Sequence, residues 1–297
     1  MKTVVSVSLG SARGDFDIET TLGGLRFRFR RMGTGGDLQR ARSLVERLDG
    51  NVDAIGLGGA NLAYWVGARR YPCREGRFVA CAAHKTPVVD GTGFKDTYER
   101  NVPAYLERNG IPVAGTSVLL VSALDRWGLG EALEAAGARV MVGDALFGLG
   151  LPVVFPGLRW FETVARLSMW GLSRLPLRRL YPMGAGQEAN TPRFAWAWRL
   201  AGMVAGDFRF IRRHMPRSLE RKIILTTSTT PRDRELLRER RARAVCTLVS
   251  PLEGRTFGAN VLDASAVAAS GKFPLEREDY LWWWERAGFE PCIERFE

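Results

Sequence analysis

The sequence contains few of the residues that build metal sites and disulfides. Among its 297 residues there are four cysteines and two histidines. The cysteines are scattered, without the spacing of zinc ligands or of a disulfide framework. We therefore expect no metal ion. We also expect a reduced, cytoplasmic protein, because disulfides are rare in that compartment.

The sequence also lacks an uninterrupted apolar run of membrane-spanning length. Its first residues alternate valine with serine (VVSVS), which indicates a strand rather than a signal peptide. We find no DNA- or RNA-binding motif, no internal repeat and no low-complexity linker. With 46% hydrophobic and 25% charged residues, the composition is that of a globular protein with a substantial core.

The charge balance is strongly basic, with 43 Lys and Arg against 32 Asp and Glu and a net charge of +11. A basic surface can bind nucleic acid, an anionic membrane or an acidic ligand. Here the arginines are dispersed along many segments, which favours a solvated Arg-rich surface. We expect a small anionic substrate, neither nucleic acid nor a membrane as partner, and a second copy of the chain as a candidate partner.

Residues 1–112 have the pattern of an N-terminal mixed α/β domain on the substrate side. Residues 16–30 predict two strands joined by a Gly23-Gly24 turn, the second alternating Leu and Phe with Arg. Asp37 is the expected N-cap of a helix that ends at Leu48. Further strands are expected at residues 3–9, 52–57 and 88–89, and helices at 75–83 and 94–108.

Residues 113–297 alternate strands with helices, which predicts a Rossmann-like, doubly wound parallel sheet. Helices at about residues 145–200 would form an insertion. The strands are expected at residues 118–121, 139–142, 203–205, 222–227 and 244–249. The ligand site of such a sheet lies at the carboxyl ends of its strands.

The helix expected at residues 160–175 is basic and amphipathic. Trp160, Val164, Leu167 and Trp170 fall on one of its faces, with arginines interspersed. Such helices lie on membranes in some proteins, but here the arginines interrupt the apolar face too often for deep burial in lipid. We therefore expect this face to cover the sheet or a partner subunit.

Residues 115–144 form one strand–helix–strand unit like the first unit of a dinucleotide-binding domain. The Gly-x-Gly-x-x-Gly fingerprint would fall on Ala123, Asp125 and Gly128, so only its last glycine is present. Asp144 stands where an acid would bind the ribose hydroxyls. The alternative is a strand–helix turn without a cofactor. The candidate cofactor-binding residues are Ser122, Asp125, Arg126, Gly128, Asp144, Asp207 and Thr227.

The segment VVDGTGF at residues 88–94 resembles the second half of the Asn-Thr-Asp-Gly-x-Gly-Phe motif of the shikimate/quinate dehydrogenase family. The resemblance continues through the following helix and GTSVLLVSA to Asp144, and it extends to uncharacterised bacterial proteins labelled quinate 5-dehydrogenase. It implies a substrate domain joined to a Rossmann domain. It also implies an NAD(P)-dependent oxidoreductase that acts on a small hydroxy acid of the quinate or shikimate type.

Hydride transfer from an alcohol needs a base, which a Lys–Asp pair provides when the site lowers the pKa of the lysine. The candidates for this pair are Asp90 with Lys85 or Lys95. NAD would be preferred over NADP, because the carboxylate of Asp144 repels a ribose phosphate. The candidate substrate-binding residues are Ser11, Arg13, Gly58, Gly59, Thr92, Arg255 and Asn260.

Two other functions remain open from the sequence. The lost glycines favour a non-catalytic regulatory protein that binds a nucleotide or a small anion on the same scaffold. An enzyme that uses S-adenosylmethionine would also tolerate a loop poor in glycine. In each case we expect two domains that meet near residues 110–116. A cleft between them would be lined by the loops at residues 58–59, 90–93 and 125–128, because all three leave the carboxyl ends of predicted strands.

Overall fold

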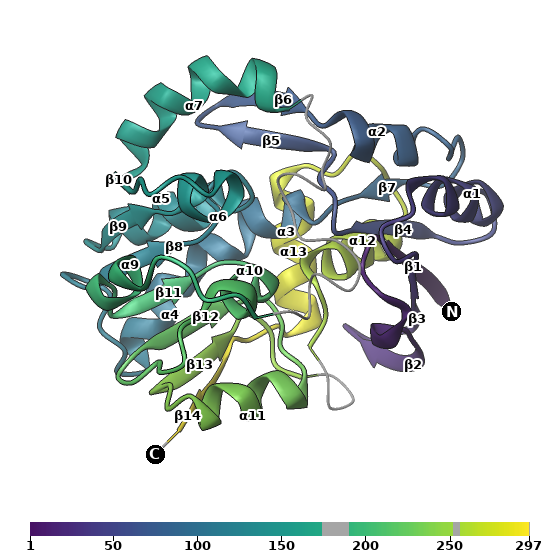
Figure 1. Ribbon diagram of the computed structural model, residues 1–297. Coiled ribbons are helices and arrows are strands. Elements are labelled where there is room, and N and C mark those ends of the chain that lie inside the picture. The colour runs from purple at the N-terminus through teal and green to yellow at the C-terminus, as the bar shows by residue number, and fades with distance from the viewer. Residues whose placement is uncertain (174–189, 252–255, 297) are drawn as a thin grey trace.

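The computed structural model describes residues 1–173, 190–251 and 256–296 of the chain. Within these ranges the chain forms a mixed α/β fold built on two separate, largely parallel sheets (Figure 1). The expected fold class is confirmed. One sheet comes from the first third of the chain and the other from the remainder.

The first sheet has the strand order β2-β3-β1-β4-β7. Only β2 is antiparallel to its neighbour; β3, β1, β4 and β7 run parallel to one another. The expected hairpin of β2 and β3 forms. In β3, Phe27 and Phe29 point into the core and are buried, whereas Arg26 on the opposite face is exposed. The bounds are β1 Lys2–Ser8, β2 Phe16–Leu22, β3 Leu25–Gly33, β4 Ala54–Gly58 and β7 Val88–Val89.

Two helices and a small hairpin complete this half. In α1 (Leu38–Leu48) the Asp37 carboxylate accepts a hydrogen bond from the Arg40 amide at 2.9 Å, which is the predicted N-cap. The helix α2 (Arg74–Ala80) is close to its expected position. The hairpin of β5 (Ala63–Val66) and β6 (Arg69–Pro72) was not predicted. Its two strands pair only with each other within the described residues.

The connection between the sheets is a broken helix rather than the single helix predicted at residues 94–108. It consists of α3 (Thr92–Thr97), a 3-10 turn η2 (Glu99–Asn101) and α4 (Val102–Arg108). Pro103 lies in the first turn of α4. A proline has no N–H to donate to the preceding turn, so the helix begins again at this point.

The second sheet has the order β10-β9-β8-β11-β12-β13-β14. Its five central strands are parallel, as predicted, and the edge strands β10 and β14 are antiparallel to their neighbours. The strand order reverses between β8 and β11, which is the switch point of a doubly wound sheet. The bounds are β8 Ser117–Leu120, β9 Arg139–Val142, β10 Phe155–Pro156, β11 Met203–Ala205, β12 Ile223–Thr226, β13 Ala244–Thr247 and β14 Cys292–Arg295.

Helices cover both faces of the second sheet (Figure 1). The helix α7 lies within a few residues of the helix expected at residues 160–175, whereas no bounds were predicted for the short helices α6 and α10. Their bounds are α5 Trp127–Ala135, α6 Asp144–Leu149, α7 Leu158–Leu172, α9 Ala195–Leu200, α10 Phe208–His214 and α11 Pro231–Glu239.

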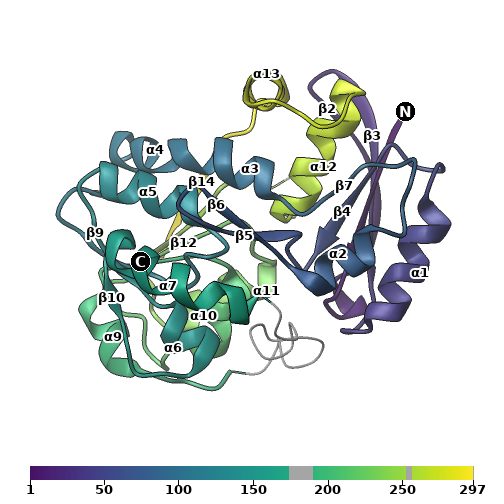
Figure 2. The ribbon, with the colours of Figure 1, turned by 90° about the horizontal axis from the view of Figure 1, so that it is seen from above.

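The last two long helices return to the first sheet (Figure 2). The helix α12 (Ala259–Ser270) packs on β1, β4 and α3, and α13 (Arg277–Ala287) packs on α12 and α3. The Asn260 amide donates to the Ser6 hydroxyl at 2.8 Å and to the Gly56 carbonyl at 3.1 Å. The domain boundary expected at residue 112 falls between the two sheets. It does not describe the packing of α12 and α13, which follow the second sheet in the sequence but pack on the first half.

One apolar cluster is continuous through both halves of the molecule. It includes Val4 and Phe27 of the first sheet, Phe94 of α3, Leu262 of α12 and Leu120 of the second sheet. A second cluster fills the other face of the second sheet. Because the first cluster crosses from one sheet to the other, the two halves are held together by core packing rather than by a flexible linker.

We predict that Gly56→Ala destabilises the protein by about 1–3 kcal/mol, because overpacking carries a cost of that order. An added β-carbon at Gly56 would overlap the backbone oxygen of Asn260, at the point where α12 crosses β4. The matched control is Gly202→Ala, since an added β-carbon there would lie 3.6 Å from its nearest neighbour. Urea unfolding would measure both variants, and equal losses would contradict close packing at Gly56.

Candidate functional site

Three loops that leave the carboxyl ends of strands meet between the two sheets. The Asp90 carboxylate, directly after β7, accepts hydrogen bonds from the amides of Leu62 at 2.5 Å and Thr92 at 3.0 Å. The Asn61 side chain donates to Asp125 Oδ1 at 3.0 Å, across from the first half of the chain to the second. The loops after β4, β7 and β8 are therefore joined by hydrogen bonds, as the predicted cleft requires.

The space between these loops is filled by buried ion pairs. Lys95 Nζ lies 2.7 Å from Asp125 Oδ1, and the Arg126 guanidinium pairs with the carboxylate of Glu99, which is fully buried. The Thr227 hydroxyl lies 3.4 Å from Glu99 Oε1. We call Lys95, Glu99, Asp125 and Arg126 the junction cluster. The remaining cavity beside it measures about 10 Å³, which is room for one water molecule.

The junction cluster keeps its lysine charged. Burial lowers the pKa of Lys95, but the carboxylates of Asp125 and Asp90 outweigh burial, and the net shift raises this pKa. Burial raises the pKa of Asp125, but Lys95 and Arg126 outweigh it, and the net shift lowers this pKa. A lysine that acts as a base needs the opposite shift. In this arrangement Lys95 is the ion-pair partner of Asp125.

Lys85 does not meet Asp90. It lies at the amino-terminal end of β7, whereas Asp90 follows the carboxyl end. The Lys85 side chain is exposed, and its backbone amide donates to Asp49 Oδ1 at 2.8 Å. The predicted pairing of Lys85 with Asp90 is wrong, because the length of β7 separates the two residues.

Asp144 has a different partner from the predicted one. Its carboxylate accepts hydrogen bonds from the backbone amides of Ala123 at 2.6 Å and Leu124 at 3.1 Å, in the loop after β8. In a dinucleotide-binding domain the amides of this loop bind the pyrophosphate. Burial raises the pKa of Asp144 to about 7, and the two hydrogen bonds partly oppose that shift.

The other candidate cofactor residues are also engaged. Gly128, in the first turn of α5, faces the guanidinium of Arg100. Asp207 caps α10 and accepts from the Arg209 amide at 2.8 Å and from its guanidinium at 2.7 Å. Because Asp144 holds the loop amides and the junction cluster holds Asp125 and Arg126, the residues present do not fit a dinucleotide in this conformation.

An apolar cavity of about 210 Å³ lies beside the loop after β8. The loop, α6 and the segment that follows it, and the inner face of α7 form its walls. Asp144 is partly exposed in its lining, beside the buried Ser122. The lining comprises Tyr64, Val121, Ser122, Leu124, Asp144, Ala145, Gly148, Leu149, Leu151, Val153, Phe155, Phe161, Val164, Ala165, Ser168, Met169, Leu172 and Phe210. Sequence patterns missed this cavity, because its walls are distant segments that become neighbours only in the fold.

The candidate substrate-binding residues do not form one group. The Ser11 hydroxyl accepts from the Arg13 amide in a turn after β1. Asn260 is bonded to the first sheet, and Gly58 packs against its side chain. Thr92 and Gly59 do lie at the junction, where an added β-carbon at Gly59 would lie 3.5 Å from the Arg209 guanidinium. Arg255 lies outside the described residues.

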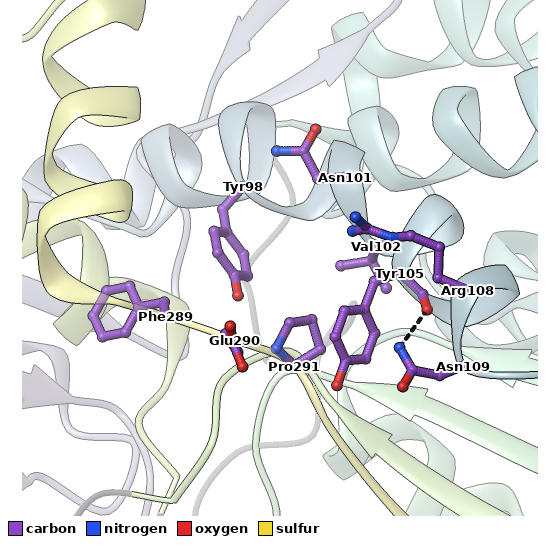
Figure 3. Close-up of a pocket in the computed structure, with 9 residues that line it drawn as sticks. All are labelled: Tyr98, Asn101, Val102, Tyr105, Arg108, Asn109, Phe289, Glu290 and Pro291. Carbon is purple, nitrogen blue, oxygen red and sulfur yellow. Dashed lines mark hydrogen bonds between the residues drawn. The ribbon is translucent and has the colours of Figure 1, made fainter.

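A second concave region lies between α4 and the segment before β14, with a volume of about 490 Å³. Figure 3 shows the rings of Tyr98 and Tyr105 pointing toward the segment at Glu290 and Pro291, and Asn101 pointing away from it. The Tyr98 hydroxyl is buried beneath this surface and inaccessible to solvent. The polar groups of this region therefore do not converge on one point.

The described residues contain no group of three or more His, Cys, Asp and Glu side chains placed to hold a metal ion. None of their helices is long and apolar enough to cross a membrane.

The chain belongs to the family described as Domain of unknown function (DUF8754), whose model matches residues 93–296. A second model, described as Domain of unknown function (DUF8753), matches residues 3–90. The two matches meet at the loop that carries Asp90, just before α3. Neither description names an activity, and no curated protein matches the chain.

Several solved structures are similar to the chain at low identity. A hetero-hexameric glutamate dehydrogenase from Thermus thermophilus is 13% identical, with 97% of this chain and 73% of that chain covered and a TM-score of 0.46. A galactofuranose binding protein is 12% identical, with 97% and 99% covered and a TM-score of 0.33. A sugar-transport substrate-binding protein from Bordetella parapertussis 12822 is 13% identical, with 92% and 81% covered and a TM-score of 0.32. At these TM-scores the similarities carry no argument about function.

We predict that Arg126→Leu lowers the free energy of unfolding by about 3–5 kcal/mol, because Glu99 then remains buried without its charge partner. The double variant Arg126→Leu/Glu99→Leu should lose less than the sum of the two single variants. Glu235→Ala breaks an exposed pair with Arg238 and is the control, with a much smaller loss. Chemical denaturation would measure all four, and additive losses at Arg126 and Glu99 would contradict the coupling.

Proposed function

We propose that this member of the DUF8754 family binds a small, largely apolar molecule that carries one hydrogen-bond donor. The observation that carries the proposal is the cavity of about 210 Å³ at the carboxyl end of β8. Ligand sites in doubly wound sheets lie at the carboxyl ends of the strands near the switch point, and they are mostly apolar with a few polar groups. This cavity satisfies both conditions.

The lining indicates the chemistry of the ligand. Apolar side chains from α6, α7 and the segment between them surround most of the space, and Ser122 and Asp144 are the polar groups on the loop side. Among the described residues no Lys or Arg lines the cavity. A carboxylate or phosphate would meet Asp144 without a compensating cation, so a neutral or cationic donor fits and an anion does not. The proposed ligand therefore differs from the anionic substrate expected from composition.

A second candidate is the oxidoreductase that the resemblance implies, acting with NAD on a quinate- or shikimate-like hydroxy acid. The observation in its favour is that Asp90 and Lys95 lie close enough at the junction for their charges to interact. This activity would require Lys95 to leave Asp125 and Asp144 to leave the loop amides. Binding in the apolar cavity requires neither rearrangement, which is why we prefer it.

We predict that the protein binds 2-naphthol, a neutral bicyclic probe with one hydroxyl donor, and that Gly148→Leu weakens this binding at least about tenfold. Gly148 lines the cavity, and an added β-carbon there meets no atom within 4 Å, so a leucine can fill the space without a clash. Gly171→Leu is the matched control, since Gly171 is equally unobstructed and does not line the cavity.

Isothermal titration calorimetry would measure the binding of 2-naphthol to both variants. Equal affinities of Gly148→Leu and the unchanged protein would show that the cavity is not the site. Binding of NAD that Gly148→Leu leaves unchanged would favour the second candidate function instead.

We also predict that 2-naphthol binding strengthens about threefold between about pH 6 and pH 8, because a hydrogen bond to a charged acceptor is about 1 kcal/mol stronger than one to a neutral acceptor. Asp144 has a pKa raised to about 7 by burial, so its carboxyl is mostly neutral below this pH and mostly ionised above it. Asp144→Asn should remove the pH dependence. A pH dependence of equal size in that variant would exclude Asp144 as the acceptor.

A further inference from the structure

The helix α7 has two apolar faces. Phe161, Ala165 and Met169 are buried and form a wall of the apolar cavity. The opposite side carries the four residues that the sequence placed on one face, and we call them the outer stripe. Their exposed fractions are 67% for Trp160, 46% for Val164, 83% for Leu167 and 72% for Trp170.

The outer stripe corrects the expectation that this face covers the sheet, while contact with a partner subunit stays a prediction. Within the described residues no element covers it, and the sheet is covered by the inner face instead. Two tryptophans and a leucine exposed together on one helix mark an interaction surface. The arginines that interrupt this face oppose deep burial in lipid, but they do not oppose contact with the headgroups at a membrane surface.

Arginines surround the outer stripe. Figure 1 shows α7, β6 and α2 along the same upper edge of the molecule. Trp170 shares an open groove of about 730 Å³ with Arg74 and Arg77 of α2. The turn at Gly67, between β5 and β6, lies against Glu162 and Arg166 of α7. The exposed arginines of these elements are Arg69, Arg70, Arg74, Arg77, Arg159 and Arg166. Of the nearby acids, Glu162 is already paired with Arg166.

Charge and side-chain chemistry decide between the occupants of such a surface. A second copy would bring a second row of arginines, and the chain carries a net charge of +11, so two copies repel each other. Single-stranded nucleic acid would stack on the tryptophans, but Val164 and Leu167 between them have no ring to stack on. An anionic lipid surface suits all three kinds of side chain present here. Tryptophan prefers the membrane interface, aliphatic side chains insert among acyl chains, and arginines bind the headgroups.

We propose that the outer stripe and its flanking arginines dock the protein on the surface of an anionic membrane. The helix α7 lies parallel to the surface, with Trp160, Leu167 and Trp170 at the boundary between headgroups and acyl chains. Val164 belongs to the stripe and also lines the apolar cavity, so docking would place the cavity beside the lipid. The docking surface does not depend on the proposed ligand, because Trp160, Leu167 and Trp170 lie outside the lining of the cavity and Val164 alone is shared.

Co-sedimentation of the full chain with vesicles tests the proposal. We expect binding to vesicles of phosphatidylcholine mixed with phosphatidylglycerol, and much weaker binding to phosphatidylcholine alone or at high salt. Leu167→Glu should weaken the binding about ten- to a hundredfold, since a charge replaces a side chain that enters the acyl region. The matched control is Leu281→Glu, at an exposed position of α13, which should bind like the unchanged protein.

A second variant separates insertion from charge. Trp160→Leu/Trp170→Leu keeps an apolar stripe, so we expect binding within a few-fold of the unchanged protein. In vesicles whose lipids carry bromine on the acyl chains, this variant should lose the quenching of tryptophan fluorescence that the unchanged protein shows. Arg74→Glu/Arg77→Glu should weaken binding about tenfold or more, because each lost basic residue removes about 1 kcal/mol of attraction.

Three results would overturn the proposal. The first is no binding to anionic vesicles, and the second is equal loss of binding by Leu167→Glu and Leu281→Glu. The third is a dimer in sedimentation equilibrium that Leu167→Glu alone converts to monomer, since the outer stripe would then be an interface between copies. None of these results bears on 2-naphthol binding in the cavity, so the two proposals fail separately.

Discussion

The junction cluster is the constraint to which the rest of the site responds. Glu99 and Lys95 come from the segment that connects the two sheets, and Asp125 and Arg126 come from the loop after β8. Burying these charges is costly unless each one keeps its partner. The connecting segment and the loop therefore hold one another, and the carboxyl ends of the two sheets are drawn together with room for little more than a water molecule.

Because the junction cluster fills the space between the two sheets, the larger cavity lies on the other side of the loop after β8. With Asp125 and Arg126 committed to the cluster, the loop after β8 turns its amides of Ala123 and Leu124 toward Asp144. A carboxylate from the chain then occupies the place of an anionic ligand on that loop. The open space at the switch point lies beyond Asp144, and apolar side chains from α6 and α7 surround it. Charge pairing on one side of the loop thus leaves an apolar site on the other.

The helix α7 joins this cavity to the molecular surface. Its inner face closes the cavity, and its outer face adds the tryptophans to the arginines of α2 and β6. A helix that packs on one sheet normally needs a single apolar face. A second apolar face costs solubility unless something covers it, so its presence indicates a function beyond packing. The fold places that face beside a cavity suited to apolar ligands.

Local patterns in the sequence determined most of the elements and the class of the fold. The alternation in β3, the Asp37 cap of α1 and the apolar runs of β8 and β9 all lie where they were expected. Such patterns report hydrogen bonds and burial within a few residues, which is why they are legible without the structure. The hairpin of β5 and β6, the short helix α6 and the antiparallel strand β14 were missed, because their stability comes from distant neighbours.

The tertiary structure decided the partners of the charged residues. Lys95, Asp90 and Asp125 were all candidates from the sequence, but which of them pair depends on how the loops of two sheets meet. Asp144 was expected to face a ribose. Instead its carboxylate accepts hydrogen bonds from the loop amides that would otherwise be available to a ligand. The outer stripe was recognised as one helical face, but periodicity cannot tell which face of a doubly apolar helix is buried. Partner and orientation are properties of long-range packing, and no local pattern contains them.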